Sequence, residues 1–70
     1  MKRKHLVKKI GQESKRRGVR WESLRDVGGH EVFDLDGVRI SIPRHTEVGE
    51  GLATDILQDT QSKLGKGWWR

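Results

Sequence analysis

The sequence predicts an α+β domain in which a helix, an antiparallel three-stranded sheet and a second helix follow one another along the chain. Apolar residues recur at helical spacing near both ends, and apolar and polar residues alternate around a turn dipeptide in the middle. Only one face of the central sheet is apolar. We therefore expect both helices to cover that face and to leave the other face open.

The length of the chain limits it to a single domain, residues 1–70. Because hydrophobic residues make up 31% of the sequence, the core must be thin and the stability marginal. Contact with a partner, or with a second copy of the chain in a homodimer, could supply part of that stability. The sequence has no cysteine, which excludes disulfides and thiolate metal sites. It shows no signal-peptide pattern and no long apolar run, so we expect a cytoplasmic protein without a membrane segment.

Residues 2–17 are predicted to form the first helix. Leu6, Val7 and Ile10 give it a narrow apolar stripe. Gly18 is placed to end this helix in the left-handed conformation, which glycine adopts without a steric penalty.

Residues 19–27 are predicted to form the first strand. Leu24 breaks the alternation of this strand, and a bulge near residues 22–23 would restore it. The pair Gly28-Gly29 then marks a turn.

The clearest element is a hairpin of residues 30–35 and 38–42 around Asp36-Gly37, a dipeptide typical of a type I′ turn that fixes the strand register. This register gives the sheet one apolar face, made of Phe33, Leu35, Val38, Ile40 and Ile42. The opposite face is mostly polar and carries His30, Val32, Asp34, Arg39 and Ser41. Pro43 cannot donate a ladder hydrogen bond and should end the third strand.

Residues 49–64 are predicted to form the second helix, which Gly65 ends. Its apolar stripe repeats at helical spacing and consists of Leu52, Ala53, Ile56, Leu57, Thr60 and Leu64. Trp21 should pack between the sheet and a helix. Trp68 and Trp69 in the tail could stack on nucleic-acid bases, but we favour their folding back over the thin core or meeting a partner protein.

The charge of the chain, +5 with a pI near 10.1, favours a polyanionic partner. Most of the basic residues lie in residues 1–20, where Glu13 is the only acid. A solvated positive face is the alternative interpretation. That alternative does not explain Lys2, Arg3 and Lys4, because cations at a helix start are disfavoured by about 0.3–1 kcal/mol each. Phosphate binding would explain them.

His30 is the strongest candidate for chemistry near neutral pH. It follows Gly28 and Gly29, which allow a sharp turn and leave space for a substrate, and it begins a strand on the open face. Cleavage of RNA through its own 2′-hydroxyl needs a base, an acid and positive charge on the phosphate. His30 could be the base or acid, while Arg39 or Arg44 holds the phosphate. The alternative is that His30 is simply a polar residue after a turn.

The other histidines have weaker cases. His45, in the loop before the second helix, is either a second acid/base group, a phosphate contact or an ordinary loop residue. His5 lies among lysines and is expected to be solvated. The three histidines show no metal-ligand spacing, so we expect no metal.

Several of these motifs together resemble the HicA family, messenger-RNA interferase toxins of bacterial toxin–antitoxin pairs. The motifs are Gly28-Gly29-His30-Glu31-Val32-Phe33, Arg39-Ile40-Ser41-Ile42-Pro43-Arg44-His45, the pair Ile56-Leu57 and the ending Gly65-Lys66-Gly67-Trp68-Trp69-Arg70. The resemblance covers residues 4–70. It implies a fold like a double-stranded-RNA-binding domain, cleavage that depends on His30, no metal or other cofactor, and a HicB-like antitoxin that covers the open sheet face. Gly29 differs from the serine that is commonest in the family at that position.

The resulting hypothesis is a metal-independent endoribonuclease that cuts mRNA and arrests growth, with His30 as the acid/base residue. The residues expected to contact RNA are Lys2, Arg3, Lys4, Arg39, Arg44 and His45. Two alternatives stay open. One is an RNA-binding module of the same fold that does not cut, and the other is an interaction protein whose open sheet face docks a partner.

Overall fold

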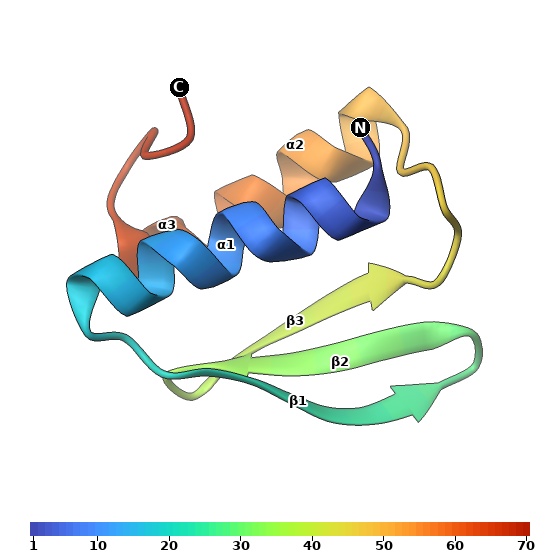
Figure 1. Cartoon of the computed structure of the whole chain (residues 1–70), viewed down its shortest axis with the longest axis horizontal. Coiled ribbons are helices and arrows are strands. Elements are labelled where there is room, and N and C mark those ends of the chain that lie inside the picture. Colours follow the sequence, from blue (N-terminus) through green and yellow to red (C-terminus); the bar gives the residue numbers. More distant parts are fainter.

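The computed structural model describes all residues from Met1 to Arg70. Its elements are α1 (Arg3–Arg17), β1 (Trp21–Val27), β2 (His30–Leu35), β3 (Val38–Pro43), α2 (Glu50–Asp59) and α3 (Gln61–Leu64). The strands form one antiparallel sheet in the order β1-β2-β3 (Figure 1). The predicted α+β class and the α-β-β-β-α order are confirmed.

The molecule has two layers, with α1 and α2 both lying over one face of the sheet (Figure 1). The hydrophobic core fills the space between these layers. It consists of Leu6, Ile10, Phe33, Leu35, Ile40, Ile42, Val48, Ala53, Ile56, Leu57 and Leu64. The other face of the sheet carries no helix, as the one-sided apolar pattern predicts. None of the helices has the length and apolar character needed to cross a membrane.

Helix α1 begins one residue later than predicted and ends where expected. Leu6 and Ile10 are fully buried, and Gly18 adopts the left-handed conformation with φ of 69°. The backbone N–H of Val19 donates to the Ser14 carbonyl at 2.8 Å, which draws the chain after the helix back against it. Strand β1 therefore starts at Trp21, two residues later than predicted.

Both hairpins turn through two consecutive residues with positive φ, the geometry of a type I′ turn. These values are 54° and 80° at Gly28 and Gly29, and 48° and 94° at Asp36 and Gly37. The second turn produces the predicted register, in which Phe33 lies opposite Ile40 and Leu35 opposite Val38. The predicted division of the hairpin into two faces is thus confirmed.

The bulge in β1 lies one residue later than predicted. The register of β1 against β2 shifts between Ser23 and Arg25, so that Leu24 is the extra residue. After this shift, Arg25 lies opposite Val32 and Val27 opposite His30, on the uncovered face of the sheet. Leu24 and Val27 are exposed instead of joining the core.

The predicted helix 49–64 is wrong in one respect, because it breaks into α2 and α3 at Thr60. The buried Thr60 hydroxyl donates to the Leu57 carbonyl at 2.6 Å and accepts the indole N–H of Trp68 at 2.7 Å. A side chain that bonds to the preceding turn competes with the helical ladder, and here the helix is interrupted.

The three tryptophans take structural positions. Trp21 stacks on Phe33 with ring centroids 4.3 Å apart and planes within 2°, and it packs against Gly11 of α1. Trp68 and Trp69 are partly buried and pack against the core. The tail therefore folds back, which is the arrangement that we favoured over base stacking.

Candidate nucleic-acid interface

His30 is exposed on the uncovered face of the sheet. It is the first residue of β2 and lies opposite Val27 on one side and Pro43 on the other. Side chains alternate along a strand, so its ring is on the face opposite Glu31 and Phe33. The imidazole makes no hydrogen bond or ion pair within the chain. It is therefore free to meet a ligand at this end of the sheet.

Arg25 is the basic residue on the uncovered face nearest to His30 in the sheet register. It lies opposite Val32, two residues along β2 from His30, and its exposed guanidinium makes no ion pair. Sequence reasoning missed this residue. The bulge predicted near residues 22–23 already places Arg25 on the open face, because one extra residue anywhere between Trp21 and Arg25 reverses the alternation.

Arg39 shares the uncovered face with His30 but lies at the far end of it. It is opposite Asp34, four residues along β3 from Pro43, the partner of His30. At roughly 3.3 Å per residue, this offset amounts to about 13 Å. The guanidinium also donates to Asp34 at 2.7 Å. The structure therefore does not bring Arg39 to the same phosphate as His30.

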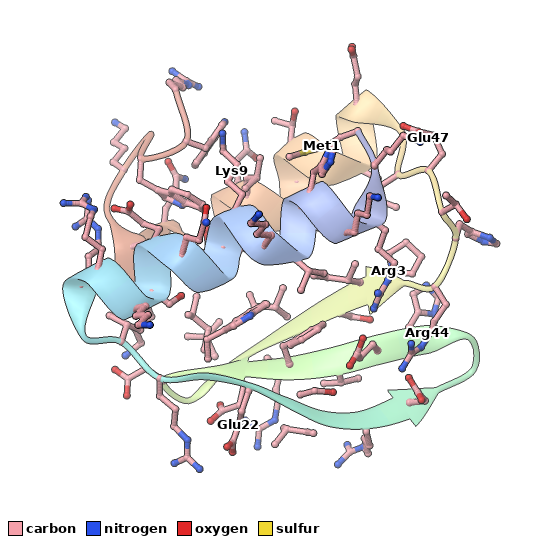
Figure 2. The ribbon with its side chains drawn as sticks, viewed as in Figure 1. Met1, Arg3, Lys9, Glu22, Arg44 and Glu47 are labelled. Atoms are coloured by element: carbon pink, nitrogen blue, oxygen red, sulfur yellow. The ribbon has the colours of Figure 1, made fainter.

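Four of the residues expected to contact RNA come together in one pocket. Lys2, Arg3 and Lys4 at the start of α1 meet Arg44 and Thr46 from the loop after β3 around a depression of about 280 Å³. Arg3 and Arg44 lie near each other at one end of the sheet (Figure 2). No acidic and no hydrophobic residue lines this cationic pocket, as we call it below.

The side chain of Arg3 is held in place from two directions. Its Nε donates to the Pro43 carbonyl at 2.9 Å, and its Nη2 donates to the carboxylate of Glu31. Glu31 also accepts a hydrogen bond from the Ser23 hydroxyl. This bond is the largest cause that lowers the pKa of Glu31, and the bond from Arg3 adds to it, while burial opposes both. Glu31 is therefore a charged anchor for Arg3.

Arg44 is anchored in the same way by Asp26. Its Nε and Nη2 lie 2.8 and 2.7 Å from Asp26 Oδ1, and Nη2 is 3.6 Å from Glu31. The hydrogen bond to Asp26 is the main cause that raises the pKa of Arg44. Lys2 and Lys4, by contrast, form no ion pair, although Lys2 lies opposite Glu47 in a β-bridge and its charge helps to lower the pKa of Glu47.

The cationic pocket and His30 lie at the same end of the sheet but on different sides of it. The backbone N–H of Arg44 donates to the Gly29 carbonyl at 3.0 Å, which ties the rim of the pocket to the turn before His30. Arg3 reaches the sheet through Glu31 on the covered face. The ring of His30 is on the opposite face.

The remaining histidines supply no partner for His30. His45 is exposed in the loop after β3, makes no hydrogen bond and does not line the cationic pocket. His5 is exposed on α1. No group of three His, Cys, Asp or Glu side chains is arranged to hold a metal ion. The His30 end of the open face thus offers one imidazole with an unpaired guanidinium nearby, while Asp34, Arg39 and Glu22 lie at the far end.

Comparison with known proteins finds no matching family model, no matching curated protein and no matching solved structure.

Proposed function

We propose that this chain is a HicA-like endoribonuclease that cuts mRNA, with His30 as the acid/base residue. The observation that carries the proposal is the exposed, unbonded imidazole of His30 at the end of a sheet face that no helix covers. The type I′ turn at Gly28-Gly29 leaves His30 exposed at the start of β2, which supports access by a strand of RNA. The order of elements is the one that the HicA resemblance implies.

The proposed reaction uses the 2′-hydroxyl of RNA as the nucleophile. This oxygen bonds to the adjacent phosphorus while the bond from phosphorus to the 5′-oxygen breaks. Neutral His30 accepts the 2′ proton, and the leaving 5′-oxygen takes a proton from the imidazolium or from water. The products are a 2′,3′-cyclic phosphate and a 5′-hydroxyl. Arg25 would stabilise the negative charge that grows on the phosphate.

The proposed protein partner is a HicB-like antitoxin that covers the open face. Leu24 is 38% exposed and Val27 is 52% exposed, and Val27 lies directly opposite His30. Exposed apolar side chains beside a reactive group suit a partner that buries both at once. Such a partner would block access of RNA to His30.

A second candidate function is RNA binding without cleavage. The position of the cationic pocket favours it, because the ring of His30 and the pocket are on different faces of the sheet. The lack of a second histidine beside His30 also favours it. Both functions predict RNA binding, but only the first predicts that His30 is needed for cutting.

The deciding experiment compares His30→Ala with the parent protein. We expect the parent to arrest growth when it is expressed alone, and to cut RNA in the presence of a chelator. His30→Ala should lose both activities and still bind RNA. His5→Ala, a change of an exposed histidine on α1, is the matched control and should behave as the parent does. Equal cutting by His30→Ala and the parent would reject the catalytic role.

A further inference from the structure

The lining of the cationic pocket fits one chemical class of ligand. Four of its five lining residues are basic, and the fifth, Thr46, offers a hydroxyl. A volume of about 280 Å³ corresponds to about nine water molecules, enough for a phosphate with an attached sugar. With no apolar or aromatic side chain in the lining, the pocket offers no stacking platform for a base. The chemistry suits a sugar–phosphate backbone.

The cations of the pocket are held in position without being neutralised as a group. Arg3 uses Nε and Nη2 in its bonds to Pro43 and Glu31, which leaves the other donors of its guanidinium available. Lys2 and Lys4 form no ion pair, and Glu47, which lies opposite Lys2, is paired with the N-terminal ammonium of Met1. A site with two anchored guanidiniums and two ammonium groups outside any ion pair is prepared for an anion before the anion arrives.

The first turn of α1, which supplies lysines to the pocket, lacks the usual compensation for positive charge. Helix α1 has no acidic residue in its first turn, where acids would be favourable. The lysines of the pocket stand at this end of the helix instead. An anion bound in the pocket would offset their repulsion from one another and from the helix dipole.

The route from the pocket to His30 passes over the Gly28-Gly29 turn. The Arg44 N–H bonds to the Gly29 carbonyl, so the turn adjoins the pocket. A Cβ atom added at Gly28 or Gly29 would meet nothing within 4 Å, which means that the outer side of the turn is open. A flexible single strand can therefore bend around this end of the sheet.

We infer that the cationic pocket is a backbone subsite for single-stranded RNA, binding a phosphate and ribose that flank the nucleotide presented to His30. This inference rests on the proposed function. It assigns the pocket a role that does not depend on base sequence, because backbone contacts carry no sequence information directly. Any preference for particular bases then comes from the open face.

The test measures binding of a labelled RNA that cannot be cut. A 2′-O-methyl oligoribonucleotide lacks the free 2′-hydroxyl, so its affinity can be followed by fluorescence anisotropy over a range of salt concentrations. The pocket variant is Lys2→Gln/Lys4→Gln. The matched control is Lys15→Gln/Lys66→Gln, which removes the same charge from exposed positions outside the pocket.

We expect the pocket variant to lose about tenfold or more in affinity near 0.1 M salt. Its salt slope should fall by about 1.4, since each lost single-strand phosphate contact removes about 0.7. The control should lose about twofold or less. Circular dichroism should show both variants folded, so that the difference reports the pocket itself.

An equal loss of affinity in the two double variants, or no loss in the pocket variant, would overturn the inference. So would an absence of binding by the parent at low salt. Cutting of unmodified RNA is measured separately. If the parent does not cut RNA, and only the pocket variant has weaker RNA binding, the nuclease proposal is wrong. The inference that the pocket is an RNA subsite is then still supported.

Discussion

Arg3 at the start of α1 and Glu31 in β2 form an ion pair in which the side chains are only 18% and 14% exposed. The pair joins the helix layer to the sheet at the end where the cationic pocket lies. Glu31 also bonds to Ser23 of β1 and lies 3.6 Å from Arg44. One carboxylate thus connects a helix, two strands and both arginines of the pocket.

Glu31→Gln should reduce the free energy of unfolding by about 1–3 kcal/mol. The neutral amide weakens the bond from Arg3 and leaves a half-buried guanidinium without its counter-charge. Urea unfolding followed by circular dichroism measures this change. Glu22→Gln is the matched control, because Glu22 lies on β1 with a 46% exposed side chain and pairs only with Arg20. The free energy of unfolding of Glu22→Gln should differ from that of the parent by no more than about 0.5 kcal/mol. Similar costs for the two variants would contradict the anchoring role of Glu31.

The contribution of Glu31 should also depend on pH. Its pKa is lower in the folded chain than the usual 4.5, so the folded state favours the ionised form. The resulting stability is present above pH 4.5 and is lost as the pH falls through the depressed pKa. The difference in unfolding free energy between the parent and Glu31→Gln should therefore shrink when unfolding is measured at pH 7 and then at progressively lower pH. A constant difference would show that the carboxylate charge is unimportant there.

The local signals in the sequence predict the sheet well. Asp36-Gly37 fixes the register because a two-residue type I′ turn leaves the strands no freedom to slip. That register also sets the distance between His30 and Arg39, so the separation of this pair could have been recognised from the sequence alone.

The features that the sequence does not predict depend on contacts between distant segments. The apolar repeat runs unbroken through Thr60, and the break there involves the indole of Trp68. The cationic pocket forms because the loop after β3 returns to the start of α1. There Arg3 N–H bonds to the Thr46 carbonyl at 2.9 Å, and Val48 N–H bonds to the Met1 carbonyl at 2.8 Å. The periodicity of the sequence does not predict these contacts between segments.

Thr60→Val should destabilise the fold by about 1–3 kcal/mol and release the tail. The substitution removes the acceptor of the Trp68 indole N–H and the bond to the Leu57 carbonyl, while it keeps the side-chain volume similar. The indole N–H resonance of Trp68 should shift and exchange faster with solvent. Thr54→Val, at an exposed position of α2, should leave that resonance unchanged. An unchanged indole N–H resonance of Trp68 in Thr60→Val would contradict the hydrogen bond between Trp68 and Thr60.

Substitution by alanine should have opposite effects on the stability of the fold at two exposed glycines. At Gly29, φ of 80° is costly for any residue with a Cβ, so Gly29→Ala should lower the stability by about 1 kcal/mol. At Gly51 in α2 the φ is not positive and a Cβ would meet nothing within 4 Å, so Gly51→Ala should raise it by roughly 0.5–1 kcal/mol. Thermal unfolding of the two variants checks both signs. A neutral Gly29→Ala would mean that the turn before His30 can adopt another conformation.

Arg25→Gln should reduce RNA cutting by tenfold or more if His30 is the acid/base residue. Arg25 has no ion pair to lose and is exposed, so its removal should change the stability by less than about 0.5 kcal/mol. The loss of a positive charge beside the reacting phosphate acts on the rate instead. Single-turnover cleavage of unmodified RNA measures it. Arg39→Gln, about 13 Å along the sheet by strand spacing, should cause a smaller loss. If Arg39→Gln instead had the larger effect, RNA would lie further along the open face than the position of His30 implies.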